Sequence, residues 1–252
     1  MSNRNILADL FSDIRIPKGE ILFLYVRLKT LHEISGLPYS KLVQEIIALL
    51  IKKYSPRSIL IPTFTYSFTR SGVFHLQFSK SEIGRFSEEV RLANFIYRTP
   101  DPIFSVIEIG NYVSQLQEIR YCSAFGPKSL FAHLTAEDYI IVNIDLQEFV
   151  STQLHYIERI CNVPYRLEKK FNGVVYNLQG HYEEIDYYYY ARDLTLTAEW
   201  DRKKIERVLV DNGNLRVNNS NPVKVLWNRS SQMVSVLCSE IQNDPEFLLK
   251  RY

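Results

Sequence analysis

Residues 21–62 contain two apolar strand sequences, Ile21-Leu22-Phe23-Leu24-Tyr25 and Ser58-Ile59-Leu60-Ile61-Pro62. Between them, Ser40 is the expected cap of a helix whose apolar residues recur at helical spacing: Leu42, Val43, Ile46, Ile47 and Leu50. Continuous apolar strands joined by a helix are typical of a parallel sheet that is covered on both faces. We therefore predict an α/β fold with three α/β/α layers and a mixed, largely parallel central sheet.

The rest of the chain extends this pattern. We expect helices over residues 7–14, 85–94, 105–113 and 201–210 and before Asp244, and a strand over residues 139–146. From residue 163 to residue 196 the pattern changes to β, with Asn172-Gly173 as a turn and four consecutive tyrosines at 187–190. This β-rich extension is expected to cover the site, and residues 1–252 are expected to form a single domain.

Composition limits the class of protein. A chain of 252 residues that is 46% hydrophobic can bury a large core. A net charge of +2 without a long basic run argues against nucleic-acid binding. No apolar run reaches the roughly 18 residues that cross a bilayer, so a soluble, cytoplasmic protein without membrane contact is expected. Cys122, Cys161 and Cys238 lie far apart without C-x-x-C spacing, which favours buried thiols over a disulfide or zinc site.

His155 and Glu158 form the most informative motif. Their three-residue spacing places both side chains on one face of a helix. A carboxylate beside an imidazole fixes the protonated ring nitrogen and leaves the other nitrogen free to accept a proton near neutral pH. The apolar segment 140–146 precedes this helix, with Ser151 or Thr152 as its cap, and open α/β sheets bind ligands beyond strand ends of this kind. The same spacing also occurs in solvated helix pairs, so the pair alone leaves both interpretations open.

Aromatic residues are abundant, with 17 Tyr and 14 Phe, several of them within residues 62–68 and 187–190. Tyrosine combines an apolar ring with a polar hydroxyl, which suits the wall of a pocket for a sugar or a nucleobase. Half-buried strands also use tyrosine for packing alone. Both interpretations of the tyrosine run remain open.

Several sequence blocks, in this order, resemble the aminoglycoside 3-N-acetyltransferase family over most of the chain. The most specific block is Thr152-x-Leu154-His155-x-x-Glu158. The other blocks are Pro17-Lys18-Gly19-Glu20, Ile61-Pro62-Thr63-Phe64-Thr65-Tyr66-Ser67-Phe68, Gly84-Arg85-Phe86-Ser87-Glu88-Glu89-Val90-Arg91, Arg98-Thr99-Pro100-Asp101-Pro102-Ile103-Phe104-Ser105 and Phe125-Gly126-Pro127-Lys128-Ser129.

The resemblance implies an N-acyltransferase that uses an acyl-CoA cosubstrate and no metal. In that reaction His155 is the general base and Glu158 orients its ring. Thr152 and Ser105 are family positions near the pantetheine and the thioester, although each hydroxyl is equally suited to capping a helix. Phe125 and Gly126 belong to a loop near the coenzyme.

The chain also departs from the family pattern. Tyr25-Val26-Arg27-Leu28 stands where many members read His-Ser-Ser-Leu, Phe104 replaces a frequent histidine, and Lys128 replaces a loop glycine. Hydroxyls that would contact the coenzyme are therefore absent from the first strand. Arg27 and Lys29 can bind coenzyme phosphates instead, or they are solvated surface charges.

The acceptor is the least determined part of the resemblance. The blocks around Arg98 and Arg166 are similar to members that acylate nucleotide-linked (dTDP-type) amino sugars for surface polysaccharides, with acetyl or a longer hydroxyacyl group such as 3-hydroxybutyryl. The expected acceptor contacts are then Tyr66, Arg98, Arg166, Tyr188 and Arg192. The alternative is aminoglycoside 3-N-acetylation, to which the acidic residues Glu183, Glu184, Asp186 and Asp193 are suited.

The sequence also leaves two other classes of function open. One is metal-dependent hydrolysis, with ligands drawn from His75, His155, His181 and Glu158. The other is a non-catalytic binding module, because a fold alone does not fix a function. The expected partners are small-molecule substrates. A homo-oligomer is also possible, because no residue pattern decides the oligomeric state.

Overall fold

The computed structural model describes residues 7, 10–93, 97–196, 198–219 and 223–251. Its main element is a seven-stranded mixed sheet with the strand order β4-β5-β2-β1-β6-β10-β9. The strands of this sheet are β1 (Ile21–Val26), β2 (Ser58–Pro62), β4 (Tyr97–Arg98), β5 (Val106–Gly110), β6 (Ile140–Ile144), β9 (Arg216–Asn218) and β10 (Val225–Arg229).

The centre of the sheet is parallel and its two flanks are antiparallel. β1 pairs in parallel with β2 on one side and with β6 on the other. β5 and β10 continue the sheet in antiparallel register, next to β2 and β6 respectively. The mixed α/β fold that the apolar strands predicted is confirmed.

Two hydrophobic clusters flank this sheet, and adjacent residues of β1 belong to opposite clusters. Phe23 packs into one cluster and Leu24 into the other. On the first face lie α7 (Leu130–Ala136), α8 (Gln153–Ile160), α9 (Arg202–Asp211) and α10 (Ser230–Asn243). On the second face lie α3 (Tyr39–Tyr54) and α5 (Arg85–Leu92). The alternation of side chains along a strand thus produces the three layers.

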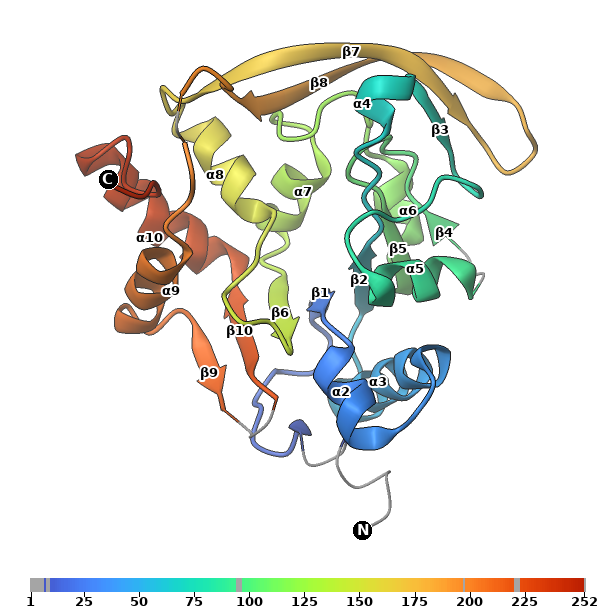
Figure 1. Ribbon diagram of the computed structural model, residues 1–252, viewed down its shortest axis with the longest axis vertical. Coiled ribbons are helices and arrows are strands. Elements are labelled where there is room, and N and C mark those ends of the chain that lie inside the picture. The colour runs from blue at the N-terminus through green and yellow to red at the C-terminus, as the bar shows by residue number, and fades with distance from the viewer. Residues whose placement is uncertain (1–6, 8–9, 94–96, 197, 220–222, 252) are drawn as a thin grey trace.

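A second, three-stranded sheet lies outside the three layers. It contains β3 (Val73–His75), β7 (Arg166–Tyr176) and β8 (Tyr182–Arg192), and the last two form a long antiparallel hairpin. Figure 1 shows this hairpin arching across the top of the molecule, above α8, α7 and α4 (Phe68–Ser71). The expected β-rich extension is therefore confirmed, and it covers the end of the molecule where α8 lies.

Two predictions of local structure are wrong. Residues 105–113 were expected to be helical, but 106–110 form β5, whose apolar residues pair with β2. A short helix, α6 (Val113–Gln117), begins only after this strand. Asn172-Gly173 is not a turn but part of β7, where the two residues pair with β8. The glycine is needed there because a Cβ at residue 173 would lie 2.2 Å from the Gly72 carbonyl oxygen. The chain reverses at 177–180 instead.

Other boundaries differ by a few residues. α3 begins at Tyr39 with Pro38 at its N-cap, so Ser40 is not the cap. The helix expected at 85–94 is α5, and residue 94 lies outside the described residues. Of the expected helix 7–14, residues 8 and 9 also lie outside them. One helix that the sequence pattern did not predict, α2 (Lys29–Ser35), comes shortly after β1.

No single helix within the described ranges is long and apolar enough to cross a membrane. α2 and α3 meet the length and composition criteria only when taken together, as a pair bent by 99°.

Candidate active site

The helix that carries His155 and Glu158 is held at a fixed place beyond β6. Asn143 at the end of β6 donates from its side chain to the Val150 carbonyl at 2.9 Å and accepts from the Val150 amide at 2.6 Å. These two bonds close the connecting loop. Leu154 and Ile157 then bury one face of α8 in the core. The local sequence therefore presents His155 and Glu158 above the carboxyl ends of the parallel strands.

Thr152, at the start of α8, is joined to β1. The Tyr25 hydroxyl donates to Thr152 Oγ1 at 2.9 Å and accepts from the Thr152 amide at 2.9 Å. Neither Thr152 nor Ser151 caps the helix as expected, since Thr152 makes no capping bond and Ser151 Oγ accepts only from the Gln153 amide. Tyr25, which stands where many family members read histidine, thus ties the start of α8 to β1.

His155 and Glu158 contact each other as their spacing predicted. His155 Nδ1 lies 3.3 Å from Glu158 Oε2, with the His155 side chain 19% exposed and that of Glu158 fully buried. This contact uses Nδ1 and leaves Nε2 as the ring nitrogen available to a substrate. The pair therefore has the geometry of a base and its orienting group.

Glu158 has two further partners that the sequence did not reveal. Trp200 Nε1 donates to Glu158 Oε1 at 2.7 Å, and Arg166 Nε forms an ion pair with Oε2 at 2.5 Å. Burial alone would raise the pKa of Glu158, but the hydrogen bond to His155 and the charge of Arg166 outweigh it, so the pKa is held below its usual value. The carboxylate stays ionised inside the protein because two hydrogen-bonding side chains, His155 and Trp200, and the charge of Arg166 surround it.

The surroundings keep His155 neutral. Burial lowers its pKa below the ordinary 6.5, the hydrogen bond to Glu158 opposes this, and the nearby Arg166 charge lowers it further. A neutral imidazole with Nδ1 engaged can accept a proton at Nε2 at neutral pH.

Aromatic rings enclose the imidazole. The ring centres of Trp200, Phe125 and Tyr189 lie 4.6, 5.1 and 6.5 Å from that of His155. Phe104 contacts both Phe125 and Tyr189, at 4.9 and 5.3 Å, and so extends this wall away from the base. The enclosure excludes water from one side of His155 and is the physical cause of its lowered pKa.

A pocket of about 980 Å³ opens beside His155 under the hairpin. Its lining carries both charges. The basic residues are Arg166, Lys169, Arg192, Arg202, Lys203 and Lys250, and the acidic residues are Glu148, Glu199 and Asp201. Several of these charges already have partners: Lys250 pairs with Glu199 at 2.9 Å, and Asp201 accepts from the Lys204 amide at the start of α9. Glu148 has a half-buried side chain on the loop between β6 and α8.

Arg166 and Arg192, two of the predicted acceptor contacts, line this pocket, and they stand opposite each other at the open end of the hairpin. Tyr66 and Tyr188 are not among its described lining residues. Tyr188 projects to the opposite side of β8 from Tyr189, which does line the pocket. The tyrosine run therefore supplies a wall residue one position away from the predicted one.

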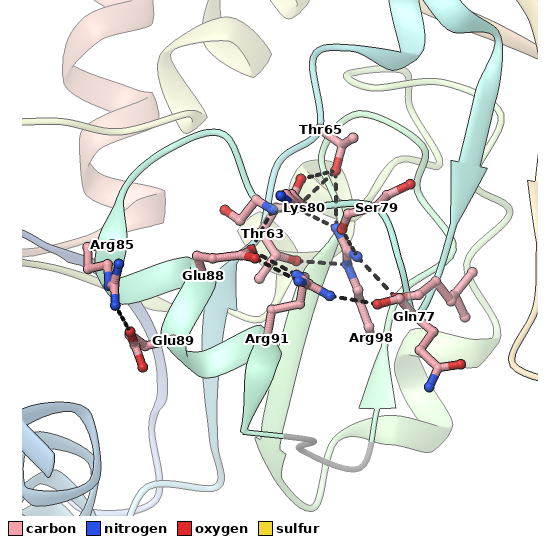
Figure 2. A network of polar contacts seen from close by, with 12 residues as sticks. Thr63, Thr65, Gln77, Ser79, Lys80, Arg85, Glu88, Glu89, Arg91 and Arg98 are labelled. Atoms are coloured by element: carbon pink, nitrogen blue, oxygen red, sulfur yellow. Dashed lines mark hydrogen bonds and ion pairs between the residues drawn. The ribbon is translucent and has the colours of Figure 1, made fainter. Parts of the chain in front are cut away.

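Arg98 lies in a buried polar network (Figure 2). It is not among the described residues that line the pocket. Its guanidinium donates to Thr63 and Ser105 hydroxyls at 3.1 Å and to the Ser79 carbonyl at 2.7 Å. Burial and the neighbouring Arg91 lower the pKa of Arg98 to about 9. The donors of Arg98 thus hold loops of the fold together, and the Ser105 hydroxyl is part of the same buried network.

The residues predicted for the coenzyme lie outside the described lining of this pocket. Phe125 and Gly126 are buried, and Gly126 fits tightly, because a Cβ there would lie 2.8 Å from Ser123 Oγ. Arg27 and Lys29 follow the carboxyl end of β1, where the Lys29 side chain is 66% exposed and lies 4.0 Å from Glu33.

The acidic residues that the sequence analysis associated with a cationic acceptor are not among the described residues that line the pocket beside His155. Glu183, Glu184 and Asp186 line a second pocket of about 1000 Å³ on the hairpin, together with Arg120.

His75, one of the histidines considered as a metal ligand, stacks on Tyr176 with the ring centres 4.1 Å apart. In the part of the chain that the structure describes, no three His, Cys, Asp or Glu side chains come together as a metal site.

Comparison with known proteins agrees with this geometry. A model of the family described as aminoglycoside 3-N-acetyltransferase matches residues 30–232. A search of curated proteins found no match.

Solved structures share the fold at low identity. Aminoglycoside acetyltransferase AAC(3)-IIb is 13% identical with a TM-score of 0.76, covering 96% of this chain and 97% of its own. AAC-VIa with bound sisomicin is 16% identical with a TM-score of 0.75, covering 95% and 97%. The YokD protein from Bacillus subtilis is 13% identical with a TM-score of 0.75, covering 96% and 93%. A further relative, AAC-IIIb, is solved as a binary complex with CoASH.

These comparisons correct the expected acceptor. The prediction of a nucleotide-linked amino sugar is wrong, because the matched family is described by aminoglycoside acetylation and a related structure holds sisomicin. The alternative that the sequence left open is the one that the comparisons favour.

Proposed function

The chain belongs to the aminoglycoside 3-N-acetyltransferase family, and from this premise we propose that it transfers an acetyl group from acetyl-CoA to an amino group of an aminoglycoside. As a member, it is a coenzyme A-dependent acyltransferase. The observation that carries the proposal is the buried contact between His155 and Glu158 at the edge of an open pocket.

In the proposed reaction the acceptor amine binds in the pocket with its nitrogen next to His155 Nε2. The neutral amine attacks the thioester carbonyl, and His155 takes the proton that the nitrogen loses. Glu158 stabilises the resulting imidazolium through the Nδ1 contact. When the tetrahedral intermediate collapses, the carbon–sulfur bond breaks and the imidazolium returns the proton to the thiolate. A positioned base of this kind contributes about 10²–10⁴-fold to the rate.

The remaining contacts of Glu158 keep this pair ready for the reaction. Arg166 and Trp200 hold the carboxylate ionised and oriented, so it can stabilise a cation as soon as one forms. They act through Glu158 and are therefore positioning residues in this proposal.

For the coenzyme, we propose the side of the imidazole formed by Phe125, Gly126 and Thr152. Phe125 contacts the His155 ring at 5.1 Å, which puts a thioester on this wall within reach of the base. Arg27 and Lys29, after the carboxyl end of β1, supply positive charge for the coenzyme phosphates.

For the acceptor, the carboxylates that line the pocket support a cationic substrate. Glu148 and Asp201 line the same pocket as His155, and their carboxylates suit the ammonium groups of an aminoglycoside. Tyr189 and Trp200 supply flat apolar surface for a sugar ring.

The test is release of free thiol from acetyl-CoA with a panel of aminoglycosides, using the full-length protein. We expect turnover with at least one aminoglycoside, an N-acetylated product by mass spectrometry, and loss of turnover in His155→Ala. If acetyl-CoA binds but no aminoglycoside is acetylated at any pH between 6 and 9, the acceptor assignment is wrong.

A further inference from the structure

Two of the three cysteines meet in space although 77 positions separate them. Cys161, directly after α8, has its Sγ 3.1 Å from the Sγ of Cys238 in α10. Both side chains are partly accessible. The third cysteine, Cys122, is also partly accessible but stands next to β8, away from this pair. Cys161 and Cys238 are therefore a close thiol pair, and Cys122 is a separate thiol against which the reactivity of the pair can be compared.

The pair is suited to oxidation. A disulfide requires the sulfurs to be about 2.05 Å apart, so they need to approach by only about 1 Å. The two helices that carry them already pack together. The contact with Cys238 lowers the pKa of Cys161, whereas the same contact and burial raise the pKa of Cys238. The contact between the two sulfurs therefore favours loss of a proton from one of them, and the thiolate is the form of a cysteine that reacts with an oxidant.

We propose that Cys161 and Cys238 are a redox modification site that forms a reversible intramolecular disulfide. With a peroxide as oxidant, the thiolate of one cysteine attacks one peroxide oxygen and the O–O bond breaks, which gives a sulfenic acid and a hydroxide that takes up a solvent proton to become water. The thiol of the other cysteine then attacks the sulfenic sulfur, the S–OH bond breaks, and the hydroxyl group leaves with the thiol proton as a second water. Two thiols and one hydrogen peroxide yield one disulfide and two waters.

The place of this bond gives it a structural effect. The segment between the two cysteines contains Arg166, Trp200 and the whole hairpin. Cys161 itself lies three residues after Glu158. A disulfide would therefore close a loop whose two ends lie at the catalytic helix and at α10. Closing a long loop restricts the unfolded chain, so the oxidised protein resists unfolding more than the reduced one.

The experiment treats the full-length protein with hydrogen peroxide, alkylates the remaining thiols with iodoacetamide and maps the peptides. We expect a peptide that joins Cys161 to Cys238, with Cys122 alkylated, and full reversal by dithiothreitol. The melting temperature of the oxidised protein should rise by roughly 5–10 °C. This readout requires no turnover, so the inference stands or fails independently of the proposed acceptor.

Matched variants separate the pair from a general effect of oxidation. Cys122→Ser should keep both the cross-link and the rise in melting temperature, while Cys161→Ser and Cys238→Ser should lose both. The wild-type peptide map decides the matter even if a variant folds poorly. Alkylation of Cys161 and Cys238 after peroxide treatment, or a cross-link that involves Cys122, would overturn the proposal.

Discussion

Trp200 Nε1 donates a 2.7 Å hydrogen bond to Glu158 Oε1 while its ring packs 4.6 Å from the imidazole of His155. One side chain, 42 positions after Glu158 in the sequence, therefore contacts both members of the proposed catalytic pair. Trp200→Phe keeps a ring but removes the donor. We expect a loss of about 1–3 kcal/mol in the free energy of unfolding, because a buried carboxylate oxygen loses its partner.

The same substitution should also move the pH profile. Without the Trp200 donor, Glu158 attracts the imidazolium more strongly, so the pKa of His155 rises and the acid limb of kcat/KM shifts to higher pH. Trp227→Phe is the matched control, since Trp227 lies in β10. An unchanged profile in Trp200→Phe would show that the contact is structural only.

The ion pair between Arg166 and Glu158 should matter more for stability than an exposed ion pair that also joins α8 to β7. Glu158→Gln leaves the Arg166 charge buried without its partner, and we expect a loss of about 3–5 kcal/mol in urea unfolding. Glu168→Gln, which breaks the exposed pair with Arg159, should cost less than about 1 kcal/mol. Equal effects of the two substitutions would contradict the buried, charge-paired state of Glu158.

His155→Ala should lower kcat by about 10²–10⁴-fold, because the reacting amine loses its proton acceptor. Binding of acetyl-CoA, measured by calorimetry, should change little, since Phe125 stays in the proposed thioester wall and the backbone bond from His155 to the Thr152 carbonyl does not depend on the imidazole. Circular dichroism and the melting temperature provide the control for folding. A variant with near wild-type kcat would remove His155 from the mechanism.

Stability should depend on pH through His155. Its pKa is below 6.5 in the folded protein, so the unfolded chain binds a proton first as the pH falls. The contribution of neutral His155 is therefore fully present above pH 6.5 and is lost as the pH falls below this value. Urea unfolding of wild type and His155→Gln between pH 5 and 8 measures it. The difference in stability between the two should favour wild type less at pH 5 than at pH 8.

A substitution of Glu148 tests whether the acceptor binds in the pocket beside His155. Glu148→Gln should raise KM for an aminoglycoside about tenfold, which corresponds to about 1.4 kcal/mol, while KM for acetyl-CoA stays constant. Glu183→Gln, which changes the second pocket, should leave both constants as in wild type. If Glu183→Gln raises KM and Glu148→Gln does not, the acceptor binds at the second pocket.

The sequence predicted those parts of the fold in which local pattern and tertiary packing agree. The buried strands 21–25 and 58–62 and the contact of His155 with Glu158 are of this kind, because neighbours within a few residues determine them. Residues 106–110 were misassigned to a helix because only pairing with β2 reveals their strand conformation. Partners from distant segments, such as Trp200 for Glu158 or Cys238 for Cys161, have no local signal at all.

The hairpin of β7 and β8 divides its residues between two tasks. Arg166 stands at its open end, where it pairs with Glu158, whereas the reversal at 177–180 lies eleven residues further along. The hairpin residues that line the pocket beside His155 also lie towards the base, within 166–171 and 189–192, whereas residues 172–175 and 183–186, nearer the tip, line the second pocket. Changes near the tip therefore alter the second pocket while the ion pair of Arg166 with Glu158 and the pocket wall beside His155 stay as they are.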